Sequence, residues 1–167
     1  AFDPVDRDVI YAGGSGLYRS DDCGATWRLL FPSPDGALME EMAGDHADHR
    51  FLSGCPWPGG VVHRILVDET NGSHVALGIV SEKRLLLYWS DDRGASWREL
   101  ARVEGGAFHA LCLSPAQDGC RSLYCITDRT ICAVPLNGGV PAAIALPQAA
   151  PTIVHAACGR HPSTGEP

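Results

Sequence analysis

A twelve-residue pattern occurs twice in this chain, at Leu17–Arg28 and at Leu87–Arg98, and the two copies are identical at nine positions. A second repeat has a fixed period, because His63, His109 and His155 each lie inside an apolar run and are spaced 46 residues apart. Self-similarity with a period of roughly 40–50 residues is typical of repeat proteins, in which each repeat is one supersecondary unit. The repeats therefore constrain the fold more tightly than the function.

Each copy of the pattern contains the series Ser-x-Asp-x-Gly-x-(Thr or Ser)-Trp. The serine hydroxyl and the aspartate carboxylate can accept hydrogen bonds from the backbone amides of a tight loop. The glycine supplies the positive φ that such a loop needs, and the tryptophan buries a large ring beneath it. We therefore expect two self-satisfied β-hairpin corners, formed by Ser20, Asp22, Gly24, Thr26 and Trp27 and by Ser90, Asp92, Gly94, Ser96 and Trp97.

The two series, Ser20–Trp27 and Ser90–Trp97, resemble Asp-boxes, which are also called bacterial neuraminidase repeats. The segment before the first series, Phe2–Gly13, is similar to the segment that leads into such boxes in β-propellers of the sialidase, xyloglucanase, sortilin and photosystem-assembly-factor type. This resemblance implies that each box is a structural corner between the third and fourth strands of a propeller blade. A corner of this kind needs no metal and no substrate.

Short β-branched or apolar runs bounded by Gly, Asp and Pro predict an all-β fold of about three four-stranded antiparallel blades. The expected strands are Val9–Gly13, Gly16–Ser20 and Thr26–Leu30 (blade 1, residues 9–30); Val61–Asp68, His74–Val80, Arg84–Ser90 and Ser96–Leu100 (blade 2, residues 61–100); Ala107–Ser114, Ser122–Thr127, Thr130–Leu136 and Ala142–Leu146 (blade 3, residues 107–146); and Thr152–Cys158, the first strand of a further blade (residues 152–158). In the third blade, Asn137-Gly138 predicts a hairpin turn where a box would otherwise stand.

Residues 1–167 thus predict a partial propeller that is cut out of phase with its blades. Propellers usually close with about 4–8 blades, so we expect this chain to be a fragment of a larger ring of six to eight blades. The alternative is that two copies associate into one six-bladed ring.

The segment 31–60 breaks the period and predicts a long insertion loop, in which Leu38–Met42 could form one helical turn. Long irregular loops are often functional. Asp45, His46, Asp48 and His49 are candidate ligands for a divalent ion, although a solvated polar loop has the same composition. Trp57, between two prolines, is a candidate stacking residue for a sugar ring or a residue packed against the rim of the propeller.

The recurring His63, His109 and His155 fall on the first strands, which lie innermost in a propeller. Imidazoles gathered around the axis could hold a metal or an anion. The simpler interpretation is that these side chains pack between blades and recur because the repeats descend from one unit.

Composition excludes several classes of function. The formal net charge is −7 and the basic residues do not cluster, which disfavours binding to nucleic acid or to anionic membranes. No apolar run is long enough to span a bilayer. The seven cysteines include no Cys-x-x-Cys pair, so they do not indicate a zinc site, and disulfides among them are expected only in an oxidising compartment.

The sequence assigns no catalytic residue and no cofactor. Our leading hypothesis is a non-catalytic, extracytoplasmic Asp-box propeller segment that recognises a carbohydrate or a protein. The location, extracellular or periplasmic, rests on the resemblance alone. The alternative is part of a sialidase-like or xyloglucanase-like glycoside hydrolase whose catalytic carboxylates lie partly outside this chain.

Overall fold

The computed structural model describes residues 1–42, 49–53, 58–82, 84–104, 106–116 and 120–144. Apart from one short 3₁₀ turn, η1 (Pro34–Gly36), its regular elements are all strands. The strands are β1 (Ile10–Gly13), β2 (Leu17–Ser20), β3 (Arg28–Phe31), β4 (Leu38–Met42), β5 (His49–Ser53), β6 (Val61–Asp68), β7 (Asn71–Ser81), β8 (Arg84–Ser90), β9 (Arg98–Glu104), β10 (Phe108–Leu113), β11 (Ser122–Thr127), β12 (Ile131–Pro135) and β13 (Ala142–Ile144).

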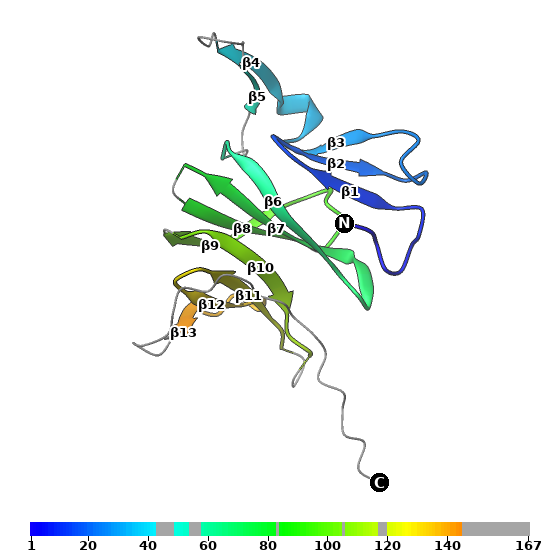
Figure 1. The fold of residues 1–167 in the computed structure, drawn as a ribbon. Helices are drawn as coiled ribbons and strands as arrows, with labels where there is room; N and C mark the ends of the chain where they lie inside the picture. The colour runs from blue at the N-terminus through cyan, green and yellow to red at the C-terminus, as the bar shows by residue number, and fades with distance from the viewer. Residues whose placement is uncertain (43–48, 54–57, 83, 105, 117–119, 145–167) are drawn as a thin grey trace.

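The strands form antiparallel sheets in which neighbours along the chain are neighbours in space (Figure 1). The first sheet has the order β1-β2-β3, the second β6-β7-β8-β9 and the third β10-β11-β12-β13. Strand β6 contacts β1 on one side and β10 on the other, so the three sheets follow one another with their leading strands adjacent. The predicted all-β fold with blade-like antiparallel sheets of three or four strands is therefore confirmed.

The sequence placed most strands within a residue or two of their observed ends. The largest differences are that β7 begins at Asn71 instead of His74 and that β9 runs to Glu104 instead of ending at Leu100. The β7 extension adds Asn71, Gly72 and Ser73, which an apolar run does not reveal, and the β9 extension adds alternating apolar and charged residues in which Val103 is buried. The expected strand at 152–158 lies outside the described residues.

The insertion between the first and second sheets is not an irregular loop throughout. Leu38–Met42, for which we considered a helical turn, is instead strand β4, and it pairs antiparallel with β5. A five-residue segment is too short to hold an isolated helical turn in water, whereas a cross-strand partner satisfies its backbone groups. This hairpin projects beyond the leading strands, at the top of Figure 1.

Successive side chains of a strand point to opposite faces of its sheet. The second sheet can therefore contribute buried residues both to the first sheet and to the third. On one face, Leu86 and Tyr88 of β8 join a buried cluster with the first sheet, which includes Leu17 and Phe31. On the other face, Leu85, Leu87 and Trp89 join a second cluster with the third sheet; its further buried members are Ala76, Val103, Phe108, Leu111, Leu123, Cys125, Cys132 and Val134. The hydrophobic core is thus built between sheets, and each junction has its own cluster.

Candidate functional site

The first predicted corner, which we call corner 1 (Ser20–Trp27), is held by its own side chains. Ser20 Oγ accepts a hydrogen bond from the amide of Gly24 at 2.8 Å and donates one to Asp22 Oδ1 at 2.7 Å. Asp22 in turn accepts the amide of Thr26 at 2.8 Å and the Thr26 hydroxyl at 2.6 Å. Gly24 has a φ of 91°, which glycine adopts without strain.

The second predicted corner, corner 2 (Ser90–Trp97), repeats this arrangement. Ser90 Oγ accepts the Gly94 amide at 2.8 Å and donates to Asp92 Oδ1 at 2.7 Å. Asp92 accepts the Ser96 amide at 2.8 Å and the Ser96 hydroxyl at 2.6 Å. The structure therefore gives the Ser, Asp, Gly and Thr or Ser residues of both corners the same local geometry. The tryptophans differ: Trp27 donates through Nε1 to the carbonyl of Gly24 at 3.0 Å and is 45% exposed instead of buried, whereas Trp97 Nε1 is buried without a partner among the described residues.

These donors stabilise the ionised form of the corner carboxyl groups. Hydrogen bonds from Thr26, first from its hydroxyl and then from its amide, lower the pKa of Asp22 to about 2. Burial opposes ionisation of Asp92, yet the hydrogen bonds from Ser96 and Ser90 lower its pKa as well. Both groups are permanent anions at neutral pH, which suits an acceptor and not a proton donor.

The middle aspartates of the two corners, Asp21 and Asp91, are also held in place. Arg19 forms an ion pair with Asp21, and Arg28 Nη2 lies 3.1 Å from the same carboxylate. At the equivalent position, Asp91 accepts a hydrogen bond from Trp89 Nε1 at 2.5 Å. Neither carboxylate stands free of partners.

The third sheet has no corner of this chemistry. Asn137 Oδ1 accepts the amide of Gly139 at 3.3 Å, and Gly138 has a φ of 87°. One backbone hydrogen bond nevertheless recurs, because the amide of Leu136 donates to the carbonyl of Arg121. The same bond runs from Cys23 to Asp8 and from Arg93 to Ser73, so it aligns the three sheets residue by residue.

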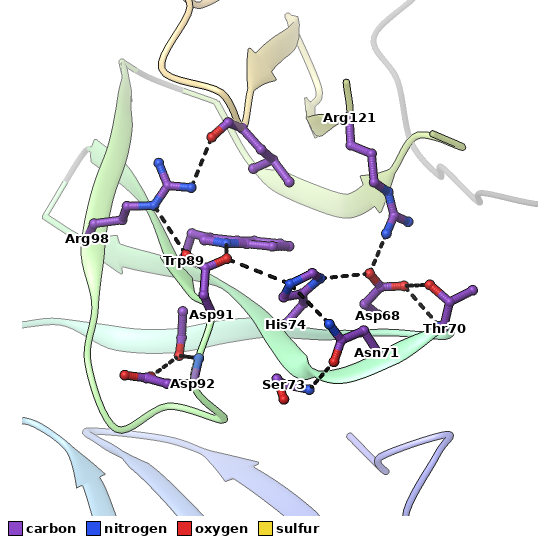
Figure 2. A network of polar contacts seen from close by, with 12 residues as sticks. Asp68, Thr70, Asn71, Ser73, His74, Trp89, Asp91, Asp92, Arg98 and Arg121 are labelled. Atoms are coloured by element: carbon purple, nitrogen blue, oxygen red, sulfur yellow. Dashed lines mark hydrogen bonds and ion pairs between the residues drawn. The ribbon is translucent and has the colours of Figure 1, made fainter. Parts of the chain in front are cut away.

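A polar network that the sequence did not reveal joins the second and third sheets (Figure 2). Its centre is Asp68, at the end of β6, which is only 2% exposed. Asp68 accepts hydrogen bonds from the amide and hydroxyl of Thr70, both at 2.9 Å, and from His74 Nδ1 at 3.1 Å. Arg121, which precedes β11 in the third sheet, forms an ion pair with the second carboxylate oxygen. Burial alone would raise the pKa of Asp68, but these hydrogen bonds lower it to about 2.

His74 connects Asp68 to corner 2. Its ring lies 5.3 Å from the ring of Trp89, and its Nε2 atom is 3.2 Å from Asn71 Nδ2 and 3.8 Å from Asp91 Oδ1 (Figure 2). The imidazole therefore stands between two carboxylates on the second sheet. One sequence signal could have indicated Asp68, because an aspartate recurs at the same place in the repeat. Asp3 and Asp68 both follow an apolar residue and precede a turn that leads into a strand.

The recurring histidines do not gather as metal ligands in the described part of the chain. His63 is exposed and His109 is half-buried, and the ring of His63 lies 6.2 Å from Phe108. Arg64 lies between them and donates to the carbonyl of His109 at 3.1 Å. Among the described residues no group of three or more His, Cys, Asp or Glu side chains could hold a metal ion. His155 lies outside the described residues.

Most of the candidate residues of the insertion are not among the residues that the structure describes. Asp45, His46, Asp48 and Trp57 lie outside the described residues, and His49 begins β5 but its side chain is not described. On β4, Leu38 and Met39 are both 63% exposed. Leu52 of β5 is buried and contacts the first sheet near Gly16. The hairpin is therefore anchored through one strand and offers apolar side chains to solvent on the other.

The cysteines differ in state. Cys112 is disulfide-bonded, whereas Cys23, Cys120, Cys125 and Cys132 are free. Burial, and after it the neighbouring Cys132, raises the pKa of Cys125 to about 12, so this thiol is a packing group rather than a nucleophile. No helix in the described ranges is long and apolar enough to cross a membrane.

Comparison with known proteins gives one informative similarity. No protein-family model matches the chain. The chain is 31% identical over 106 residues to a xyloglucanase from Paenibacillus sp, a match that covers 57% of this chain and 9% of the xyloglucanase. This chain therefore corresponds to a small part of that relative. Together with the all-β sheets, the match is consistent with a sialidase-like or xyloglucanase-like β-propeller.

Proposed function

We propose that this chain is part of an extracytoplasmic Asp-box β-propeller that recognises a carbohydrate, and that the carbohydrate is a β-glucan of the xyloglucan kind. The observation that carries the proposal is the 31% identity to a xyloglucanase. In this proposal, corners 1 and 2 are the Asp-boxes. Their Ser, Asp and Thr side chains are already hydrogen-bonded within the corner, so they support the fold, and other residues carry recognition.

Four described carboxyl groups have a pKa shifted away from the value that hydrolysis of a glycosidic bond requires. A glycosidase needs one carboxylic acid with a raised pKa that protonates the leaving oxygen. The carboxyl groups with a shifted pKa are Asp22, Asp68, Asp92 and Glu99, and all four are lowered. None of these four groups is therefore suited to act as that general acid.

We place the binding surface at the insertion between the first and second sheets. The β4–β5 hairpin projects from the leading strands (Figure 1). Leu38 and Met39 on β4 are exposed. In the same insertion, Trp57 supplies an aromatic face and Asp45–His49 supplies polar groups. Apolar and aromatic surfaces with a few polar groups are typical of sites that bind sugar rings.

The direct test measures binding of xyloglucan oligosaccharides by isothermal titration calorimetry. Trp57→Ala should weaken binding at least about tenfold, as expected for an aromatic anchor. Because Leu52 of the same insertion belongs to the core, the variant keeps β5 intact. Val5→Ser, at an exposed apolar residue in the segment before β1, is the matched control and should bind as the parent does. Unchanged binding by Trp57→Ala would place the site elsewhere.

The second candidate is a portion of a glycoside hydrolase, and the observation that favours it is that the similar protein is itself named a xyloglucanase. Release of reducing sugar ends from xyloglucan by this chain would establish that activity. Binding without release supports the recognition role, and the two outcomes distinguish the candidates.

A further inference from the structure

The dipeptide Asn-Gly occurs twice in this chain, at Asn71-Gly72 and at Asn137-Gly138. At such a dipeptide the backbone nitrogen of the glycine can attack the side-chain carbonyl carbon of the asparagine, because glycine has no side chain in the way and permits the backbone rotation that the attack requires. The new N–C bond closes a succinimide ring while the bond to the side-chain nitrogen breaks and ammonia leaves. Water then opens the ring to aspartate or isoaspartate. The reaction consumes water, releases ammonia and needs no other reactant.

Asn137-Gly138 lies in the turn between β12 and β13, and both residues are exposed. The amide of Gly138 takes part in no hydrogen bond of the described structure. Asn137 Oδ1 accepts the amide of Gly139 at 3.3 Å, which draws electron density away from the carbon that is attacked. A Cβ built on Gly138 would meet nothing within 4 Å, so the turn has room to rearrange. The attacking nitrogen and the attacked carbonyl group are therefore both available.

Asn71-Gly72 has the opposite surroundings, because it belongs to strand β7. Asn71 Oδ1 accepts the amide of Ser73 at 3.0 Å, and Asn71 Nδ2 lies 3.2 Å from His74 Nε2 (Figure 2). Gly72 is buried, and a Cβ built on it would collide with the carboxylate of Asp3 in the first sheet. Ring closure would therefore require Asn71 to leave its partners and β7 to open locally.

The exposure of Asn137 is set by packing that the structure describes. Arg98 of the second sheet donates to the carbonyl of Leu136, next to Asn137, at 3.0 Å. Corner 2 is held to the first sheet in the same way, by the bond from Arg19 to the carbonyl of Arg93. A corner or turn thus packs on the sheet before it, and for Asn137 that sheet is the second one. The turn is exposed with this sheet in place.

We propose that Asn137 is a site of spontaneous deamidation in the folded chain, and that the fold protects Asn71 from the same reaction. The product places a new carboxylate beside the carbonyl that Arg98 holds, and it adds one negative charge to a chain whose formal net charge is −7. It also removes the Asn137 Nδ2 donor that lies 3.6 Å from Cys120 Sγ. The isoaspartate form inserts a side-chain methylene into the backbone of the turn. Deamidation therefore changes both the charge and the backbone of this turn.

The test incubates the purified chain in mildly alkaline buffer and follows the two asparagine-containing peptides by mass spectrometry after digestion. In the folded chain we expect Asn137 to deamidate at least about tenfold faster than Asn71, because the reaction at Asn71 requires β7 to open. In concentrated urea the two rates should become similar, since unfolding exposes both dipeptides equally.

Asn137→Gln is the control variant, because the longer glutamine side chain forms the corresponding ring far more slowly. The parent should accumulate an acidic species on anion-exchange chromatography, and this variant should not. Equal rates at Asn137 and Asn71 in the folded chain would overturn the proposal. A tenfold difference that persists in urea would do so too, because the local sequence would then set the rates. Acidic species that form as fast in Asn137→Gln as in the parent would place the modified residue elsewhere and contradict the assignment.

Discussion

The two junctions between sheets use the same backbone frame and different side-chain chemistry. At the first junction, between the first and second sheets, an aromatic stack of Trp97 on Phe31 lies beside the cluster around Leu17 and Tyr88. At the second junction, between the second and third sheets, the ion pair of Arg121 with Asp68 lies beside the cluster around Trp89 and Phe108. The repeat thus conserves strand register while the contacts between sheets are free to change.

One contact is common to both junctions. A guanidinium of the preceding sheet donates to the carbonyl of the following corner or turn, from Arg19 to Arg93 at 3.3 Å and from Arg98 to Leu136 at 3.0 Å. The two arginines occupy different strands, β2 and β9. At both junctions a charged donor thus bonds the same turn carbonyl, although it comes from a different strand.

The largest effect should come from the aromatic side of this comparison. Trp97→Ala removes the stack on Phe31 and leaves a cavity at the first junction, so we expect a loss of about 3 kcal/mol in the free energy of unfolding. Urea denaturation followed by circular dichroism measures it. Trp97 Nε1 is buried without a hydrogen-bond partner in the described structure, so Trp97→Phe should retain most of the stability. Equal losses for both variants would contradict a role based on ring packing.

The polar junction should respond to Asp68→Asn. The amide cannot pair with Arg121 and His74 as the carboxylate does, and we expect a loss of about 2–3 kcal/mol in the free energy of unfolding at pH 7. Arg121→Met, which removes the partner from the other sheet, is the second arm of a double-mutant cycle. Additive losses would show that the two residues do not act together.

The pH dependence gives the same prediction with a defined sign. Asp68 has a pKa of about 2 in the folded chain, against roughly 3.9 when unfolded. A lowered folded pKa stabilises the fold above the unfolded value, and this contribution is lost as the pH falls from about 4 to about 2. The stability difference between the parent and Asp68→Asn should therefore shrink across that window. A constant difference would mean that the carboxylate charge is not what stabilises the junction.

Substitutions of the two corner glycines separate the stability contributed by the junction from that contributed by the corner. Gly24→Ala and Gly94→Ala both force a positive φ, 91° and 87°, on a residue with a Cβ, which costs roughly 1 kcal/mol. At Gly94 the new methyl group also meets Leu30 of the first sheet at 2.8 Å, whereas at Gly24 no atom is nearer than 3.7 Å. We expect about 2 kcal/mol for Gly94→Ala and about 1 kcal/mol for Gly24→Ala in thermal denaturation. Equal costs would show that the neighbouring sheet adapts freely.

The sequence predicted the elements whose information is local. The repeated Ser-x-Asp-x-Gly series is complete within eight residues, so the corner geometry could be read without knowing what surrounds it. The short apolar run of β8 likewise predicted a strand. The Asp68–Arg121 pair could not be predicted, because it joins residues 53 positions apart through the packing of two sheets. The β4 strand was missed because its partner, β5, lies beyond a polar segment with no strand pattern.

The smallest effect should come from introducing at the first junction an ion pair like that of Asp68 with Arg121 at the second. Asp3 is the counterpart of Asp68 in the first sheet, and its Oδ1 accepts the amides of Val5 and Asp6, but its Oδ2 is buried with no partner in the described residues. Ser73 is the counterpart of Arg121, because both carbonyls accept the recurrent amide bond of the following turn.

Ser73→Arg should therefore bring a guanidinium to Asp3 Oδ2 and raise the free energy of unfolding by about 0.5–1 kcal/mol, since a charged donor replaces an unsatisfied acceptor. Thermal denaturation of Ser73→Arg and of Ser73→Met separates the effect of the added charge from that of the longer side chain. A gain for arginine alone means that the frame of the repeat accepts either chemistry at either junction. A gain for both means that the longer side chain and not its charge stabilises the first junction. A loss for arginine means that this junction has no room for the polar contact, and that the two junctions differ in shape as well as in side chains.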